Sequence, residues 1–274
     1  PLTTKEASKI TLVAYHGDMT LDEMIHLLQQ EQEQHNNTAT TTNNMSYIWM
    51  DWFGWNPMVW TSGGQLESTL SSIPRLRKSF FQEHLYPHVS AMSQTMVLLT
   101  ASSSSSWDQC LLPALQQLWI QWEIVTAAQA NRPIRFIMSA TQKADLIQYA
   151  FEGTQLDRLR TLIQQVSNVK TATTYREADQ KDLRKLVVQQ TGGVDETNAI
   201  LLAVLQQWAS TQGTQQLHQR QQELQRYPRE NATTPLILPP DVGPTSQSLH
   251  NLAQLYVDQG RLSEAEKLHF EGVR

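Results

Sequence analysis

The sequence predicts an α/β amino-terminal domain with a doubly wound, mostly parallel sheet, followed by an α-helical extension and one carboxy-terminal helical hairpin. Three observations lead to this fold class. Short apolar segments alternate with segments of helical spacing over residues 10–140, only helical spacing follows residue 140, and residues 248–274 have the pattern of helix, tight turn and helix. Alternating strands and helices are typical of a parallel sheet that helices cover on both faces.

Four strands and three helices are expected in the first 140 residues. The strands are ITLVAY (10–15), SYIWMDWF (46–53), TMVLLTA (95–101) and PIRFIMSA (133–140). The helices are LDEMIHLLQQ (21–30), RLRKSFFQEHLYPHV (75–89) and LLPALQQLWIQWEIVTAAQA (111–130). The segment 95–101 is continuously apolar, as in a strand that is buried on both faces. A polar, low-complexity insert at 31–45 is expected to be a disordered loop, and a run of five serines at 102–106 is expected to form a loop at the carboxyl edge of the sheet.

The remaining chain divides into three parts. Residues 141–228 hold a succession of helical segments, of which VDET (194–197) resembles a helix start with early acidic residues. Residues 229–245 contain four prolines without periodicity and are expected to be a linker. Residues 246–274 form the hairpin.

Composition excludes several classes of protein. The chain has 274 residues, a formal net charge of -5 and a pI of about 5.9, so no basic surplus favours a nucleic acid or an anionic membrane as partner. Its single cysteine, Cys110, excludes an internal disulfide and a cysteine-ligated zinc site. No apolar run approaches the ~20 residues of a membrane span, and no secretory leader pattern is present. We therefore expect a cytoplasmic protein.

The carboxy-terminal hairpin alternates large and small residues at fixed positions. The packing positions are Leu252, Ala253, Tyr256, Gly260, Ala265 and Leu268. Carried by NLAQLYVDQG (251–260) and EAEKL (264–268), this pattern resembles the tetratricopeptide repeat, in its kinesin-light-chain variant. His269 and Gly272 depart from it, because an aromatic residue and an alanine are usual there.

The resemblance implies an array that binds a partner protein in its concave groove. One repeat cannot bury its own apolar face, and about three are needed for stability. We therefore expect the chain to be a fragment whose further repeats lie beyond Arg274, and residues 246–274 to be an incomplete first repeat that packs loosely behind its linker.

The α/β domain resembles the domain that precedes kinesin-light-chain-type repeats in proteins of protists. The residues that carry the resemblance are Tyr47, Trp49, Asp51, Phe53 and Asn56 in one segment, Trp107 and Asp108 in the next, and Trp119, Trp122, Glu123 and Ile124 in the third. Pro57 and Ile120 replace the glutamine and the cysteine of that family. The domain is also similar to the Toll/interleukin-receptor (TIR) domain, a flavodoxin-like fold.

In enzymatic TIR domains a glutamate four residues after a tryptophan takes part in NAD cleavage, and Trp119 and Glu123 have this spacing. The resemblance implies a ligand pocket at the carboxyl edge of the sheet. Its candidate residues are His16, Asp51, Trp52, Asn56, Trp107, Asp108 and Trp119. Alternatively, Glu123 is structural and pairs with Arg132 or Arg135, and the tryptophans are core residues. No metal site is expected, because His84 and His88, although four residues apart, lack the glutamate of the H-E-x-x-H motif.

Together these features favour a non-enzymatic signalling scaffold, in which the repeat array binds a partner protein and the α/β domain self-associates or senses a ligand. Such a protein needs no cofactor. The alternative is an NAD-cleaving or other nucleotide-hydrolysing enzyme that uses Glu123, with NAD as its substrate. A further alternative is a kinesin-light-chain-type cargo adaptor, although no long heptad region precedes the repeat to pair with a motor chain.

Overall fold

The computed structural model describes residues 10–14, 21–36, 47–50, 86–99, 107–174, 177–226 and 246–272. The chain divides into two compact units. The first holds residues 1–140 and 165–201, and the second holds residues 141–164 and 202–274. The helical extension expected over 141–228 is therefore divided between the units.

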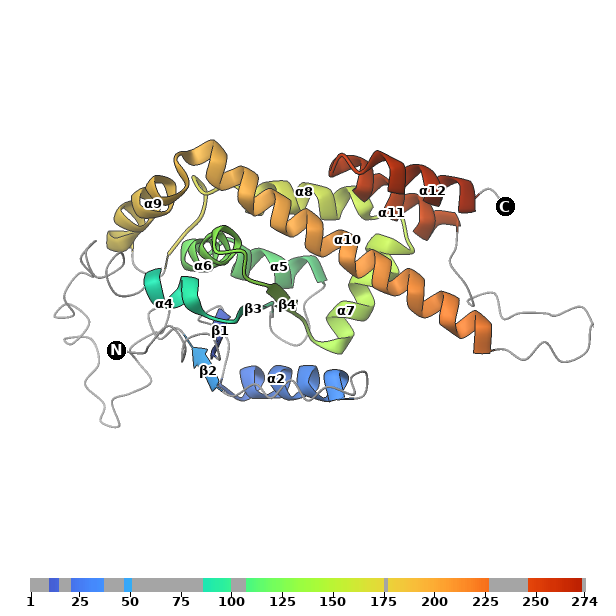
Figure 1. The fold of residues 1–274 in the computed structure, drawn as a ribbon, viewed down its shortest axis with the longest axis horizontal. Coiled ribbons are helices and arrows are strands. Elements are labelled where there is room, and N and C mark those ends of the chain that lie inside the picture. The colour runs from blue at the N-terminus through green and yellow to red at the C-terminus, as the bar shows by residue number, and fades with distance from the viewer. Residues whose placement is uncertain are drawn as a thin grey trace, which may run out of the picture. The chain divides into compact units, whose positions relative to one another are not determined.

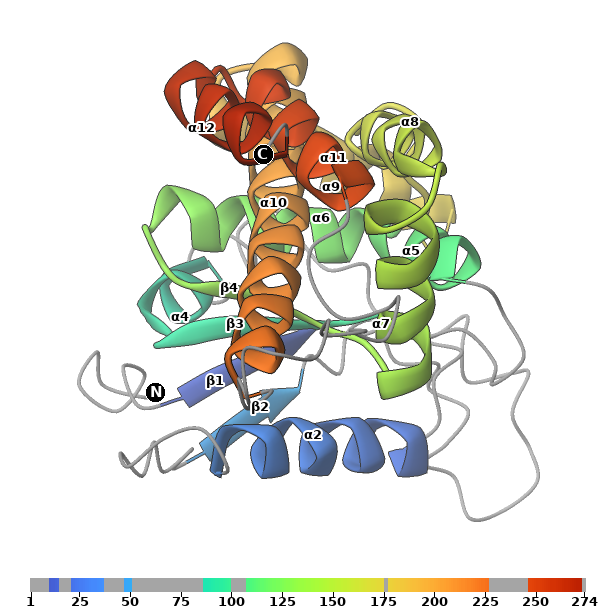
Figure 2. The same cartoon turned by 90° about the vertical axis from the view of Figure 1, so that its right-hand side faces the viewer.

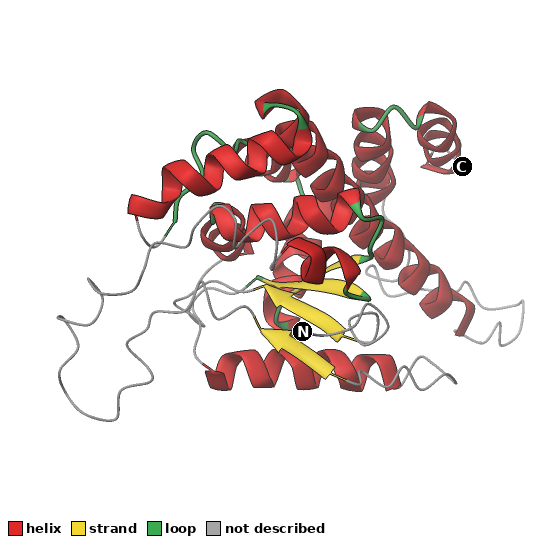
Figure 3. Ribbon diagram, turned by 60° about the vertical axis from the view of Figure 1, so that its left-hand side comes forward, coloured by secondary structure: helices red, strands yellow, loops and turns green. Residues whose placement is uncertain are grey.

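The first unit is built on a parallel four-stranded sheet (Figure 3). Its strands are β1 (Ile10–Ala14), β2 (Tyr47–Met50), β3 (Gln94–Leu98) and β4 (Ile134–Ile137). Their order in the sheet is β2-β1-β3-β4. In the register of the sheet, Leu12 lies opposite Trp49 and Thr95, and Thr95 lies opposite Ile134. Three of the strands fall within the segments that the sequence predicts, and β3 begins at Gln94, one residue before the predicted segment 95–101.

Helices cover both faces of this sheet (Figure 2). On one face, α2 (Leu21–Asn36) packs Met24 and Leu27 against Val13, in a core that also holds Met96, Leu98 and Ile137. On the other face, Leu12 packs with α4 (Tyr86–Ala91), α6 (Leu118–Gln129) and α9 (Glu177–Thr191). The neighbours Leu12 and Val13 thus serve opposite cores, because side chains alternate along a strand. The predicted α/β arrangement, with helices on both faces of a parallel sheet, is confirmed.

The insert predicted at 31–45 is not a loop throughout, because α2 continues to Asn36. The segment EQEQHN (31–36) extends the helix rather than ending it. Glutamate and glutamine are good helix formers, so a polar composition alone does not end a helix that has already begun. The rest of the insert lies outside the described residues.

The single helix predicted over 111–130 is two helices, α5 (Trp107–Leu115) and α6. At the break, Gln117 forms an isolated parallel bridge with Thr173. The Leu118 amide donates to the Thr173 carbonyl (2.8 Å), and the Thr173 amide donates to the Gln116 carbonyl (2.9 Å). These backbone groups are satisfied by a segment distant in the sequence, which periodicity within 111–130 does not reveal.

The second unit is helical, as the sequence predicts (Figure 1). Its elements are most of α7 (Ala140–Leu146), the π-helix η5 (Ile147–Phe151), most of α8 (Leu156–Val166), the later part of α10 (Val194–Arg226), α11 (Ser246–Asp258) and α12 (Leu262–Gly272). Gly260, with a φ of 72°, makes the turn between α11 and α12, as predicted. Among the described helices, none has the length and apolar character needed to cross a membrane.

Candidate functional site

The sheet-edge pocket suggested by the sequence falls largely on residues outside the described part of the chain. His16, Asp51, Trp52 and Asn56 all lie there. The pocket therefore stays a prediction.

The remaining pocket residues are buried side chains of α5 and α6. Trp107 is 2% exposed, Asp108 5% and Trp119 9%. Glu123 is 2% exposed and lies in the middle of α6. Catalysis on a dinucleotide needs a carboxylate that the substrate reaches, and this burial gives no such access. The catalytic assignment of Glu123 stays a prediction, because most of the expected pocket lies outside the described residues.

The tryptophans of α6 contribute to the packed core instead. Trp119 and Trp122 meet edge to face, with ring centroids 5.9 Å apart. The Trp122 indole donates a 3.0 Å hydrogen bond to Gln190 Oε1 on α9, and Gln190 Nε2 donates to Gln129 Oε1 (2.8 Å). Arg132 and Arg135 are the arginines that the sequence suggests as partners of Glu123. Arg132 donates a hydrogen bond from Nε to the Ser90 carbonyl (3.2 Å). Burial lowers the pKa of the Arg135 guanidinium.

The carboxy-terminal hairpin is the best-defined candidate for a binding element. Leu252, Ala253, Tyr256, Ala265 and Leu268 are buried. They form one core with Leu249 of α11 and Leu217 of α10. All the predicted large and small positions of the two helices thus lie inside the hairpin or against α10.

The expectation that residues 246–274 pack loosely is wrong. The hairpin rests on helices of its own unit, which supply the burial that a neighbouring repeat would give. Gly213 of α10 allows the close approach: a Cβ at this position would lie 3.0 Å from Leu252 Cδ1 and 3.1 Å from two ring carbons of Phe151. The helical periodicity of the hairpin alone does not reveal this contact, because Gly213 and Phe151 lie 39 and 101 residues before Leu252 in the sequence.

A buried asparagine fastens α11 to the end of η5. Asn251, 2% exposed, donates from Nδ2 to the carbonyls of Ala150 (3.1 Å), Phe151 (2.9 Å) and Gly153 (2.9 Å). Its Oδ1 accepts from Gln247 Nε2 (2.8 Å). Carbonyls at a helix end have no partner within the helix, so the amide group satisfies them. In the sequence, the only indication of this contact is that Asn251, a polar residue, lies between the apolar Leu249 and Leu252.

An ion pair joins the other end of α11 to α8. Arg160 Nη2 lies 2.6 Å from Asp258 Oδ1, and Arg160 Nη1 lies 3.1 Å from Asp157 Oδ1. The hydrogen bond that Arg160 donates to Asp258 is the main cause that raises the pKa of Arg160.

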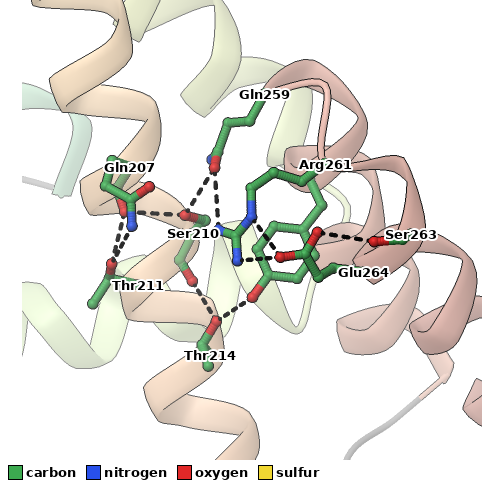
Figure 4. Close-up of polar contacts among 9 residues, drawn as sticks. Gln207, Ser210, Thr211, Thr214, Gln259, Arg261, Ser263 and Glu264 are labelled. Carbon is green, nitrogen blue, oxygen red and sulfur yellow. Dashed lines mark hydrogen bonds and ion pairs between the residues drawn. The ribbon is translucent and has the colours of Figure 1, made fainter.

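Polar contacts surround the turn of the hairpin (Figure 4). Gln259 Nε2 donates to the Gln206 carbonyl of α10 (2.8 Å), and the Tyr256 hydroxyl pairs with Thr214 Oγ1 (2.9 Å). The Arg261 guanidinium lies 4.1 Å from the Tyr256 ring centroid and donates to Glu264 Oε1 from Nε (3.1 Å) and Nη2 (2.9 Å). The hydrogen bond from Arg261 lowers the pKa of Glu264.

The hairpin also presents apolar side chains to solvent. Val257 of α11 is 41% exposed, and Leu262 and Phe270 of α12 are 63% and 66% exposed. Phe270 follows the buried Leu268 by two residues, which places it about 200° around the helix on the side away from the core. No group of three or more potential metal-ligating side chains occurs among the described residues.

Comparison with known proteins finds no matching family model, no matching curated protein and no matching solved structure.

Proposed function

We propose that the chain is a protein-interaction scaffold whose carboxy-terminal hairpin is the first repeat of a tetratricopeptide-type array. The observation that carries the proposal is the two-sided character of this hairpin. One side is buried against α10 through Leu217 and Leu252, while Leu262 and Phe270 of α12 are exposed to solvent. A solenoid needs a first unit that is covered on one side and open to the next repeat on the other.

In this proposal the helices of the second unit act as the cap of the array. Asn251, the Arg160–Asp258 pair and the Gln259 contact fix α11 on them. A fixed first repeat sets the position of the repeats that stack on it, and their concave surface binds a partner protein.

The α/β unit serves in this proposal as a TIR-like assembly or sensor domain of a cytoplasmic protein. The order β2-β1-β3-β4 supports a doubly wound assignment, because flavodoxin-like sheets have the strand order 2-1-3-4-5. Self-association of this unit would bring several arrays together and so increase their avidity for a partner. Sedimentation velocity of the whole chain over a range of concentrations tests this part.

Repeat stacking is tested by joining a consensus tetratricopeptide hairpin after Arg274. We expect the melting temperature of the fusion to exceed that of the unmodified chain, because Leu262 and Phe270 become buried. The substitutions Leu262→Glu and Phe270→Glu should abolish the increase. Lys267→Glu, at an exposed polar position of α12, is the matched control and should retain it. An increase that survives both glutamate substitutions, or no increase at all, contradicts the stacking proposal.

A further inference from the structure

Two histidines that are distant in the sequence meet on the surface of the hairpin. His250 of α11 and His269 of α12 are both exposed, and their ring centroids lie 5.6 Å apart with an interplanar angle of 59°. The rings are tilted rather than stacked in parallel. The two helices that hold them share a core of Leu249, Ala253, Ala265 and Leu268, so the separation of the two backbones is fixed by packing.

This separation suits a shared metal ion. An imidazole nitrogen binds zinc at about 2.0–2.1 Å, which places the ring centroid about 3.2 Å from the metal. Two imidazoles at a tetrahedral angle then have centroids about 5.2 Å apart, and about 5.5 Å at a wider angle of ~120°. The observed centroid separation of 5.6 Å is close to these values.

We propose that His250 and His269 form a binding site for a divalent transition-metal ion, which links α11 to α12. Imidazole nitrogen selects copper, nickel and zinc over magnesium and calcium, which prefer oxygen ligands. The described residues supply no third protein ligand, so water completes the coordination sphere. Ion binding joins the ends of the hairpin that lie far from its turn, and by linkage it stabilises the folded hairpin.

His269 offers a conservative test, because an aromatic residue is usual at this position of kinesin-light-chain-type repeats. His269→Phe keeps a planar ring beside His250 and removes the metal ligand, and His250→Gln removes the other. His218, an exposed histidine of α10, provides the matched control as His218→Gln. All variants are made in a chain that carries His84→Gln and His88→Gln, since those two histidines are four residues apart and could bind metal themselves.

The measurements are titration calorimetry with Zn²⁺, Cu²⁺ and Mg²⁺, thermal melting, and peptide-resolved hydrogen exchange. We expect Cu²⁺ to bind more tightly than Zn²⁺ and Mg²⁺ not to bind. Saturating Zn²⁺ should raise the melting temperature by about 3 °C and slow hydrogen exchange in both 246–258 and 262–272.

His218→Gln should behave like its parent in all three measurements. His269→Phe and His250→Gln should each lower Zn²⁺ affinity at least tenfold and lose the protection. Equal Zn²⁺ affinity in His269→Phe and its parent, or no Zn²⁺ binding by the parent, would overturn the proposal.

Discussion

Asn251 Nδ2 donates a 2.9 Å hydrogen bond to the carbonyl oxygen of Gly153, which joins α11 to the segment that ends the π-helix η5. The same amide reaches the carbonyls of Ala150 and Phe151. These contacts make the hairpin part of its unit rather than an appendage.

Asn251→Ala should therefore destabilise the second unit by about 3 kcal/mol, because three carbonyls lose a donor and unsatisfied buried groups are costly. Urea unfolding gives the free energy, and hydrogen exchange should show faster opening of residues 147–155. The control is Gln247→Ala, which removes only the exposed partner of Asn251 and should cost about 0.5 kcal/mol. Equal effects of the two substitutions would contradict the central role of Asn251.

The Arg160 ion pairs offer a second test, because one guanidinium meets two carboxylates of different exposure. The Asp258 side chain is 16% exposed and the Asp157 side chain 90%. We expect Asp258→Asn to lower stability by about 1–2 kcal/mol and Asp157→Asn by less than about 0.5 kcal/mol. Urea unfolding at low and high salt measures both. The cost of Asp258→Asn should largely persist at high salt, since a partly buried pair is poorly screened. A ranking in which Asp157 matters more would refute this assignment.

Glu264 gives a pH prediction with a defined sign. The hydrogen bond from Arg261 lowers the pKa of this carboxyl in the folded hairpin. The pair therefore contributes stability above the ordinary pKa of a glutamate, and the contribution is lost as the pH falls through the lowered folded pKa. Carboxyl NMR titration should find the midpoint of Glu264 below the ordinary glutamate value, and Arg261→Gln should return it toward that value. An unchanged midpoint in Arg261→Gln would show that Arg261 is not the cause.

Glu123 is expected to contribute to stability and not to NAD cleavage. Its side chain is 2% exposed inside the core of the first unit, where it takes part in further contacts. We expect negligible NAD turnover by the whole chain and by Glu123→Gln alike, with Glu123→Gln lowering the melting temperature because a buried polar group loses part of its contacts. Nicotinamide release measured by chromatography decides this. If the unsubstituted chain cleaves NAD and Glu123→Gln abolishes this turnover, the enzymatic alternative is established.

The periodicity of apolar residues predicts two kinds of element. One kind packs against a segment close by in the sequence, and the other has a strong apolar pattern of its own. The β3 segment was recognisable because its run is apolar on both faces, and the turn at Gly260 because its helices are adjacent. Contacts between segments distant in the sequence could not be predicted in this way. The break between α5 and α6 at Gln117 is bridged by Thr173, and the close packing of the hairpin on α10 occurs at Gly213. His250 and His269 are 19 residues apart, so only the antiparallel packing of α11 and α12 brings their rings together.

Gly213 tests the close approach of α10 to the hairpin. In an exposed helix interior, glycine to alanine is favourable by about 1 kcal/mol. Here the added Cβ would meet Leu252 Cδ1 at 3.0 Å and the Phe151 ring at 3.1 Å. Crowding of a packed core costs about 1–3 kcal/mol, so we expect Gly213→Ala to be net destabilising by about 1 kcal/mol and Gly213→Val by more.

Gln215→Ala, at an exposed position of the same helix, is the control and should leave stability nearly unchanged. Urea unfolding measures all three. The opposite result would be that Gly213→Ala raises the free energy of unfolding by the full helix-propensity gain. That result would show that the Leu252 and Phe151 side chains move aside without cost, and that close packing at Gly213 does not hold the hairpin on α10.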